Sequence, residues 1–340
     1  MNLRVNGVLL NESQMRDRSL LLSIEGCDAA FADFMLAWWR DSEFVLGQTS
    51  GSTGEPKRIE LSKQSMRESA KRTNAFFGLN PGDSLLMCLS ANYIAGKMMV
   101  VRAIVGGLDL YVQPASSMPR LERPYDLVSM VPLQVHSLME SGEGEKSLSH
   151  VKHLLVGGSQ LMKDELDWLT SLPLKSYISY GMTETVSHVA LSELPKCGAP
   201  LYRALPDVHF TTDNRGCLVI HADYLQGSPF VTNDMVELLT ERSFRWLGRW
   251  DNVINTGGVK VFPEKMEKKI ERLILHPYYF VGQPDAKFGQ RVVLKIESEP
   301  FDVSSLKSAL SEVLSPYEMP KEIVFLPQFT RTDSGKVKRI

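Results

Sequence analysis

Short apolar runs alternate with helix-like segments between residues 43 and 181, and this alternation constrains the fold more than any other feature. The runs that predict strands are 44–46, 85–89, 108–112, 127–131, 153–156 and 176–179. The helical patterns between them are 63–77, 93–105, 133–141 and 163–171. Because strands that alternate with helices form βαβ units, the pattern predicts an α/β fold with a mostly parallel sheet flanked by helices.

The pattern changes after Pro206, where short strand-like runs follow one another with turn residues between them. Beyond Asp251, helical segments at 264–275 and 304–314 alternate with strand-like runs, of which the last is 322–326. We therefore predict a large domain over residues 1–250 and a small α+β domain over residues 251–340. Two domains also agree with a length of 340 residues.

Two local signals predict structure near the N-terminus. Asn6-Gly7 lies between apolar residues and predicts the turn of a β-hairpin. Asp28 precedes a helical pattern over residues 29–40, where its side chain can cap the first turn.

Charge and composition exclude several classes of protein. The chain has 38 Lys and Arg against 40 Asp and Glu, so it lacks the basic excess of a nucleic-acid or membrane-surface binder. Its most apolar stretch, 98–112, contains Arg102 and Asp109 and is too short to span a membrane. The four cysteines are scattered and the N-terminus has no signal-peptide pattern. We expect a cytoplasmic protein with no nucleic-acid partner and no membrane insertion.

A loop rich in glycine and hydroxyl residues separates the apolar runs 44–46 and 59–61. Its residues are Thr49, Ser50, Gly51, Ser52, Thr53, Gly54, Glu55, Pro56 and Lys57. Glycines let backbone N–H groups approach an anion, and a lysine supplies a point charge for phosphate oxygens. It is not a Walker loop, because Lys57 does not follow the second glycine directly. The residues alone favour a phosphate site and a surface turn equally.

Four further motifs follow in order. Two of them, Gly157-Gly158-Ser159 and Tyr180-Gly181-Met182-Thr183-Glu184-Thr185, come directly after strand-like runs, where ligands bind in open α/β sheets. Taken alone, Thr183 could equally cap a helix. The others are Asn233-Asp234 with Gly248-Arg249-Trp250-Asp251, and a terminal Arg331-Thr332-Asp333-Ser334-Gly335-Lys336, for which a solvated basic tail is the alternative.

Taken together, the five motifs resemble the adenylate-forming superfamily of acyl-CoA synthetases, luciferases and peptide-synthetase adenylation domains. The first matches T-S-G-S/T-T-G-x-P-K and the last matches T-x-S-G-K. The resemblance implies ATP and CoA as co-substrates and Mg²⁺ as cofactor. A carboxylate attacks the α-phosphorus of ATP to form an acyl-adenylate and pyrophosphate, and a thiol then displaces AMP. The first step needs positioned phosphates and charge neutralisation.

The resemblance also implies roles for individual residues. Thr183 would contact the acyl-adenylate, Glu184 would hold Mg²⁺, and Lys336 would stabilise charge between the carboxylate and the α-phosphate. ATP or AMP would be bound by Thr49, Ser50, Gly51, Ser52, Thr53, Gly54, Lys57, Gly158, Ser159, Tyr180, Gly181, Met182, Asp234 and Arg249. The last two would reach the ribose.

The small domain is implied to be mobile, with Asp251 as the hinge residue about which it rotates between the two half-reactions. Gly257 and Gly258 would then line the CoA tunnel. Only 48 residues precede Thr49, fewer than in most members of the superfamily, so we expect the N-terminal part of the large domain to be reduced.

The strings at 91–99 and 180–188 look most like short bacterial o-succinylbenzoate–CoA ligases of menaquinone biosynthesis. That acid is activated at its succinyl carboxylate, so its benzoate carboxylate needs another partner. Lys97 shares a predicted helix face with Tyr93 and is embedded in apolar sequence, where an unpaired cation is unfavourable. We predict that Lys97 or Arg102 pairs with the benzoate carboxylate; structural ion pairs or solvent exposure are the alternatives.

Ser187 and His188 follow the Thr-Glu motif and are predicted to line the acyl pocket; a hydrogen-bonded structural histidine is the alternative. Three other functions stay open at this point: a CoA ligase for another aryl or short-chain acid, an enzyme that loads a carrier protein, and a non-catalytic nucleotide or acyl-adenylate binding protein. A homodimer also stays open.

Overall fold

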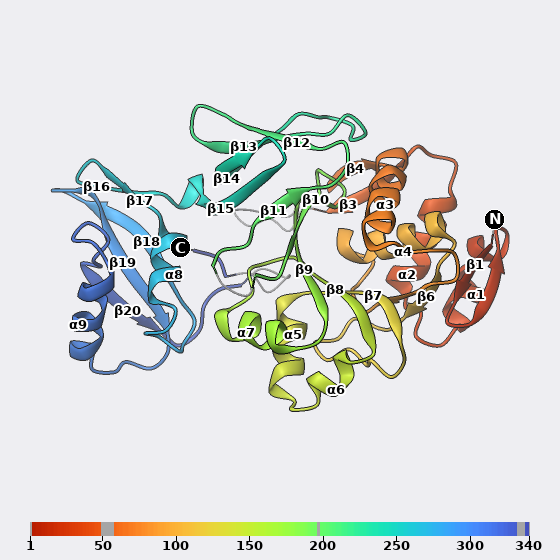
Figure 1. The fold of residues 1–340 in the computed structure, drawn as a ribbon, viewed down its shortest axis with the longest axis horizontal. Helices are drawn as coiled ribbons and strands as arrows, with labels where there is room; N and C mark the ends of the chain where they lie inside the picture. Colours follow the sequence, from red (N-terminus) through yellow and green to blue (C-terminus); the bar gives the residue numbers. More distant parts are fainter. Residues whose placement is uncertain (1, 49–57, 196–197, 332–336, 340) are drawn as a thin grey trace. The chain divides into compact units, whose positions relative to one another are not determined.

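The computed structural model describes residues 2–48, 58–195, 198–331 and 337–339 (Figure 1). Its backbone divides into two compact units. The first runs up to His209 and also contains His221–Phe230, and the second contains Phe210–Ile220 and the chain from Val231 onward. The second unit thus begins earlier in the chain than residue 251. The hinge at Asp251 stays a prediction.

The first unit is built around five parallel strands in the order β9-β8-β7-β5-β6. They are β5 (Ser84–Met87), β6 (Asp109–Val112), β7 (Tyr125–Met130), β8 (Val151–Val156) and β9 (Lys175–Gly181). Helices α3 (Lys63–Phe77) and α4 (Ile94–Gly106) lie on one side of these strands, and α5 (Pro132–Glu140), α6 (Gly144–Leu148) and α7 (Lys163–Ser171) lie on the other (Figure 1). The predicted α/β fold with a mostly parallel sheet is confirmed.

Further strands extend this sheet at both edges: β1 is parallel to β6, whereas the pairs β1–β2, β9–β10 and β10–β11 are antiparallel. The hairpin β1 (Asn2–Val5) and β2 (Val8–Asn11) adjoins β6, and β10 (His188–Glu193) and β11 (Tyr202–Ala204) follow β9. The predicted hairpin turn is confirmed, because Asn6 and Gly7 both have positive φ, 46° and 84°. The predicted Asp28 cap is also confirmed: its carboxylate accepts from Phe31 N at the start of α2 (Ala29–Trp39). The short α1 (Arg18–Ser23), which precedes it, was not predicted.

Helix α4 is buried over most of its length, which has consequences for the site. Residues 96–104 are all buried. A helix that is apolar on all sides is expected to be enclosed by other elements. Gly107 ends it in the left-handed conformation, with φ 62°, as a helix C-cap. Two basic residues, Lys97 and Arg102, are therefore carried into the interior of the first unit.

The predicted strand at 44–46 exists but lies outside the parallel sheet. It belongs to β3 (Phe44–Gln48), which pairs antiparallel with β4 (Arg58–Ser62) alone. Gln48 pairs with Arg58 at the end of this ribbon. The two ends of the glycine-rich loop are thus held together, while residues 49–57 themselves lie outside the described residues.

The second unit contains two sheets. The first has the order β12 (His209–Thr212), β13 (Cys217–His221), β14 (Phe230–Thr240) and β15 (Ser243–Arg249). The second has β17 (Val259–Val261), β16 (Ile254–Thr256), β19 (Gly289–Glu297) and β18 (Tyr278–Asp285), with β20 (Glu322–Leu326) parallel to β19. Helices α8 (Pro263–Ile270) and α9 (Ser304–Val313) pack against this second sheet through an apolar core.

The two sheets differ from the sequence prediction in details. Strands β15, β16 and β17 were not predicted, and α8 ends at Ile270 rather than at residue 275. Leu275 is 93% exposed, so its apolar side chain is not part of a helix face packed on the core. No helix among the described residues has the length and apolar character needed to cross a membrane.

Candidate functional site

The first part of the site lies where the parallel strands end. Because β8 and β9 are parallel, their carboxyl ends lie at the same edge of the sheet, as predicted for a ligand site. Gly158 and Ser159 follow β8, and Tyr180 and Gly181 are the last residues of β9. Gly158 has φ 101°, which favours glycine at this position. Two of the predicted nucleotide-binding segments are thus brought to one edge.

A tight turn joins β9 to β10 and carries Thr183 and Glu184. It is not the start of a helix, so the alternative role of Thr183 as a helix cap is wrong. The buried Thr185 Oγ1 lies 3.1 Å from Met182 N and 2.7 Å from the Ser187 carbonyl oxygen, which ties the two ends of the turn together. A Cβ on Gly181 would lie 2.3 Å from that same carbonyl oxygen, so a side chain does not fit there.

Glu184 lines a cavity of about 230 Å³ beside the β3–β4 ribbon. The ribbon contributes Phe44, Glu60, Leu61 and Ser62 to the cavity wall. The turn that carries Glu184 and the β3–β4 ribbon therefore lie close together. Three or more potential metal ligands do not cluster anywhere among the described residues. Mg²⁺ with a nucleotide needs only one or two carboxylates besides phosphates and water, and the exposed Glu184 fits that requirement.

Arg102 is a buried cation that no carboxylate among the described residues neutralises. Its side chain is 2% exposed, and burial lowers the pKa of the guanidinium to about 10. Nη2 donates to Ser187 Oγ at 2.8 Å, and Nη1 lies 3.3 Å from the Met99 sulfur, a weak acceptor. Nε has no hydrogen-bond partner within the described part of the chain. Such a group has donors left for an anionic ligand.

Lys97 is buried as well, but its contacts are different. Its ammonium group donates to the carbonyl oxygens of Ala91 and Asn92, immediately before α4, and lies 5.4 Å from the centre of the Phe34 ring. Burial lowers its pKa to about 8. These contacts support the structural alternative for Lys97. Tyr93 is the N-cap residue of α4 and is 39% exposed.

Of the residues predicted to bind the acid, the structure joins Arg102, Ser187 and His188. Ser187 is half-buried and accepts from Arg102, whereas His188 is buried and 5% exposed. His188 Nε2 lies 3.1 Å from Thr73 Oγ1 on α3. Sequence reasoning missed Thr73, because nothing in the amphipathic pattern of residues 63–77 separates it from other buried positions.

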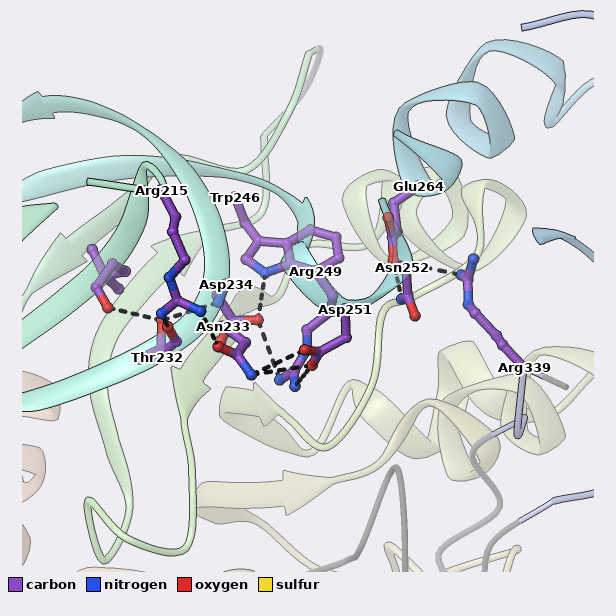
Figure 2. Close-up of polar contacts among 11 residues, drawn as sticks. Arg215, Thr232, Asn233, Asp234, Trp246, Arg249, Asp251, Asn252, Glu264 and Arg339 are labelled. Carbon is purple, nitrogen blue, oxygen red and sulfur yellow. Dashed lines mark hydrogen bonds and ion pairs between the residues drawn. The ribbon is translucent and has the colours of Figure 1, made fainter. Parts of the chain in front are cut away.

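A second group of polar residues lies in the second unit (Figure 2). Asp234 and Arg249 are paired across β14 and β15, and the carboxylate and guanidinium approach to 3.6 Å. Trp246 Nε1 donates to Asp234 at 3.1 Å. Arg249 also donates to Asp251 at 2.8 Å, and Asn233 Nδ2 lies 3.1 Å from the same carboxylate. The structure thus joins both predicted ribose ligands to the predicted hinge residue; Trp246 was missed.

Gly257 and Gly258 form the turn between β16 and β17. Their φ values are 60° and 81°, which a two-residue hairpin turn of this type requires. The geometry accounts for both glycines without a ligand, and their role toward CoA stays a prediction.

The terminal motif is described only on either side of residues 332–336, so Lys336 lies outside the described residues. Arg331 donates twice to Glu297, at 2.6 and 2.8 Å, and Lys338 N donates to the Thr330 carbonyl oxygen at 2.8 Å. Arg339 donates twice to Glu267, at 2.6 and 2.7 Å. The segments that flank Lys336 in the chain are therefore anchored to the small sheet and to α8.

The family model described as "AMP-binding enzyme" matches residues 33–213, which is more than half of the chain. The chain belongs to this AMP-binding enzyme family. A curated relative, 2-succinylbenzoate–CoA ligase of Listeria monocytogenes, is 25% identical over 319 residues, covering 86% of this chain and 68% of the relative.

Solved structures show the same fold. An acyl-CoA synthetase (AMP-forming)/AMP-acid ligase II-like protein of Dyadobacter fermentans is 34% identical, with a TM-score of 0.62 over 95% of this chain and 96% of the other. The o-succinylbenzoate CoA synthetase of Bacillus subtilis, solved with its acyl-adenylate intermediate, is 21% identical, with a TM-score of 0.75 over 86% of this chain and 67% of the other. That enzyme has also been solved with ATP and magnesium. The predicted class of this family member, an AMP-forming acid–CoA ligase that uses ATP and CoA, is confirmed.

Proposed function

We propose that this AMP-forming acid–CoA ligase activates o-succinylbenzoate, an aromatic acid with two carboxylates, for menaquinone biosynthesis. The observation that carries the proposal is the buried Arg102 guanidinium, which has no carboxylate beside it among the described residues and turns toward the half-buried Ser187. A buried cation is stable only when a partner compensates its lost hydration. The benzoate carboxylate supplies that partner and forms charge-assisted hydrogen bonds.

The succinyl carboxylate is then the reacting group. One of its oxygens attacks the α-phosphorus of ATP, the bond from that phosphorus to the bridging oxygen breaks, and pyrophosphate leaves. Residues 49–57 hold the phosphates, Glu184 holds the Mg²⁺ that accompanies them, and Lys336 stabilises the charge at the α-phosphate. Asp234 and Arg249 bind the ribose.

The second half-reaction transfers the acyl group. The sulfur of CoA attacks the carbonyl carbon of the acyl-adenylate, the bond to the phosphate oxygen breaks, and AMP leaves. Lys336 has no role in this step, so the small domain rotates about Asp251 and the hairpin turn at Gly257 and Gly258 approaches CoA. A cytoplasmic location and a homodimer stay predictions.

The proposal is tested by measuring pyrophosphate release from MgATP with a panel of acids, two of which differ only in the ring carboxylate. The panel contains o-succinylbenzoate, 3-benzoylpropionate (the same acid without the ring carboxylate), benzoate, succinate and a medium-chain fatty acid. We expect release with o-succinylbenzoate, at a kcat/KM at least about tenfold above that for 3-benzoylpropionate, because a buried ion pair contributes more than 1.4 kcal/mol. CoA must then convert the intermediate to AMP and thioester.

Other outcomes would contradict either the proposed substrate or the proposed activity. Equal rates for the two matched acids would contradict a site for the second carboxylate. Release with an unrelated acid would keep the chemistry and discard o-succinylbenzoate. ATP binding without release for any acid would favour a nucleotide or acyl-adenylate binding protein.

A further inference from the structure

A chain of polar side chains connects Arg102 to the interior of the first unit. Arg102 Nη2 lies 2.8 Å from Ser187 Oγ, and Ser187 Oγ lies 3.4 Å from His188 Nδ1. His188 Nε2 lies 3.1 Å from Thr73 Oγ1, which in turn lies 3.1 Å from the carbonyl oxygen of Ser69. The chain joins three elements, α4, β10 and α3, and both Thr73 and His188 are buried.

The contacts of this chain favour one direction for its protons. Thr73 has a single hydroxyl proton, and it donates that proton to the Ser69 carbonyl oxygen, one helical turn earlier. With that proton engaged, we assign the imidazole as the donor to Thr73, from Nε2. Burial and the neighbouring Arg102 charge both hold the pKa of His188 well below its usual range, so the ring is neutral. In a neutral ring with a proton on Nε2, Nδ1 is an acceptor.

The remaining contacts follow from this tautomer. Ser187 donates its hydroxyl proton to Nδ1, and its oxygen lone pairs are left to accept from Arg102 Nη2. The opposite tautomer would place the ring N–H at Nδ1, toward Ser187 Oγ, and would leave Nε2 as an acceptor that faces Thr73 Oγ1, whose only proton is directed to the Ser69 carbonyl oxygen. Along the series of hydrogen bonds that runs from Arg102 Nη2 to the Ser69 carbonyl oxygen, each donor thus has one acceptor.

We infer that Thr73 and His188 are positioning residues that orient Ser187 as an acceptor and thereby aim the Arg102 guanidinium at the second carboxylate of the acid. This inference rests on the proposed function for the role of Arg102. A long, unbranched arginine side chain has many rotamers, and a directional acceptor on one Nη selects among them. His188 is neither a base nor a nucleophile here, because both of its ring nitrogens are engaged and the side chain is buried.

The first experiment determines the direction of the hydrogen bonds between Arg102 and Ser69 and needs no substrate. Nitrogen NMR of the ¹⁵N-histidine-labelled intact chain, with His188 assigned through His188→Gln, reports which ring nitrogen carries the proton. We expect the Nε2–H tautomer, neutral from pH 6 to 8. An Nδ1–H tautomer or a charged ring would overturn the inference, whatever acid the enzyme uses.

The second experiment measures how the Thr73 side chain affects KM for the acid. Thr73→Val keeps the shape of the side chain but removes the acceptor for His188, and we expect it to raise KM for o-succinylbenzoate about three- to tenfold. KM for ATP and for 3-benzoylpropionate should not change, and Thr73→Ser should restore the wild-type KM. Ser176→Ala is the matched control, since it removes a buried hydroxyl that has no partner among the described residues.

The effect must also depend on Arg102. In an Arg102→Ala background, Thr73→Val should cause no further rise in KM. An equal rise for both acids, or an additive rise in the Arg102→Ala background, would overturn the inference and leave Thr73 with a structural role. If the wild-type enzyme does not distinguish the two acids, the proposed function fails, while the NMR result still decides the direction of the chain.

Discussion

Two buried basic side chains of the first unit have different surroundings from two paired arginines of the second unit. In the first unit, Lys97 and Arg102 lie buried on α4, and neither contacts a carboxylate among the described residues. In the second unit, two arginines are matched with carboxylates: the exposed Arg331 with Glu297, and the half-buried Arg339 with Glu267. Both pairs are bidentate. The same kind of side chain thus meets two different environments.

The difference separates charges that serve the fold from charges that are available to a ligand. A bidentate Arg–Glu pair satisfies both partners, so it ties two segments together and has little left for a third group. A buried guanidinium without such a partner loses hydration and keeps unsatisfied donors. We therefore expect substitutions in the second unit to change stability, and substitution of Arg102 to change the choice of acid.

The largest effect on stability is expected for Arg339→Met. It leaves the carboxylate of Glu267, on α8, without its cation, and breaking such a pair costs about 3 kcal/mol. The double variant Glu267→Met/Arg339→Met should recover most of this loss. Urea denaturation of the full chain measures both. Glu237→Gln, which removes an exposed ion pair with Arg245 in the same unit, is the control and should change stability by less than about 1 kcal/mol. An equally small loss of stability for Arg339→Met would contradict the distinction between paired arginines and Arg102, which has no carboxylate partner in the described part of the chain.

A pH-dependent effect is expected from Lys97. Its pKa is lowered from 10.5 to about 8, so the unfolded chain binds more protons than the native chain between these values. Stability of the wild type relative to Lys97→Met should therefore rise as pH increases from about 8 to 10.5, by at most about 3 kcal/mol. Below pH 8 the lysine is charged in both states and the difference should be flat. A difference that is constant up to pH 10.5 would mean that burial does not disfavour this charge.

The smallest effect on stability is expected for Arg102→Met. No carboxylate among the described residues is left behind when the guanidinium is removed, and methionine fills a similar apolar volume. The free energy of unfolding should stay within about 1 kcal/mol of the wild type, or increase. A loss close to that of Arg339→Met would show that Arg102 has a structural partner and would remove the distinction between the two units.

Much of the fold followed from the sequence, because strands buried on both faces and amphipathic helices leave strong patterns between residues 84 and 181. The strands β15, β16 and β17 were missed, since β16 and β17 have three residues each and Trp246 to Trp250 carries no alternation of apolar and polar residues. The run 44–46, which lies in β3, was predicted as part of the parallel sheet, because a strand-like run does not reveal its partner.

The candidate site was predicted less completely. The motifs placed Glu184, Asp234 and Arg249, but the sequence left Lys97 and Arg102 open. Which of the two can reach the acid depends on the direction of the side chain. Lys97 extends toward the N-terminal end of α4 and donates to carbonyl groups there. Arg102 instead meets Ser187, which is 85 residues away in the chain. Contacts across such a separation carry no local signal, and the same holds for Thr73 and His188.

The most direct test of the account compares Arg102→Ala with the wild type on two acids that differ only in the ring carboxylate. Initial rates of pyrophosphate release give kcat/KM for o-succinylbenzoate and for 3-benzoylpropionate, with Lys97→Ala as a second variant. The account predicts that Arg102→Ala lowers the value for o-succinylbenzoate about 10- to 100-fold and leaves that for 3-benzoylpropionate within about twofold. Equal losses for both acids, or a selective loss in Lys97→Ala instead, would contradict it.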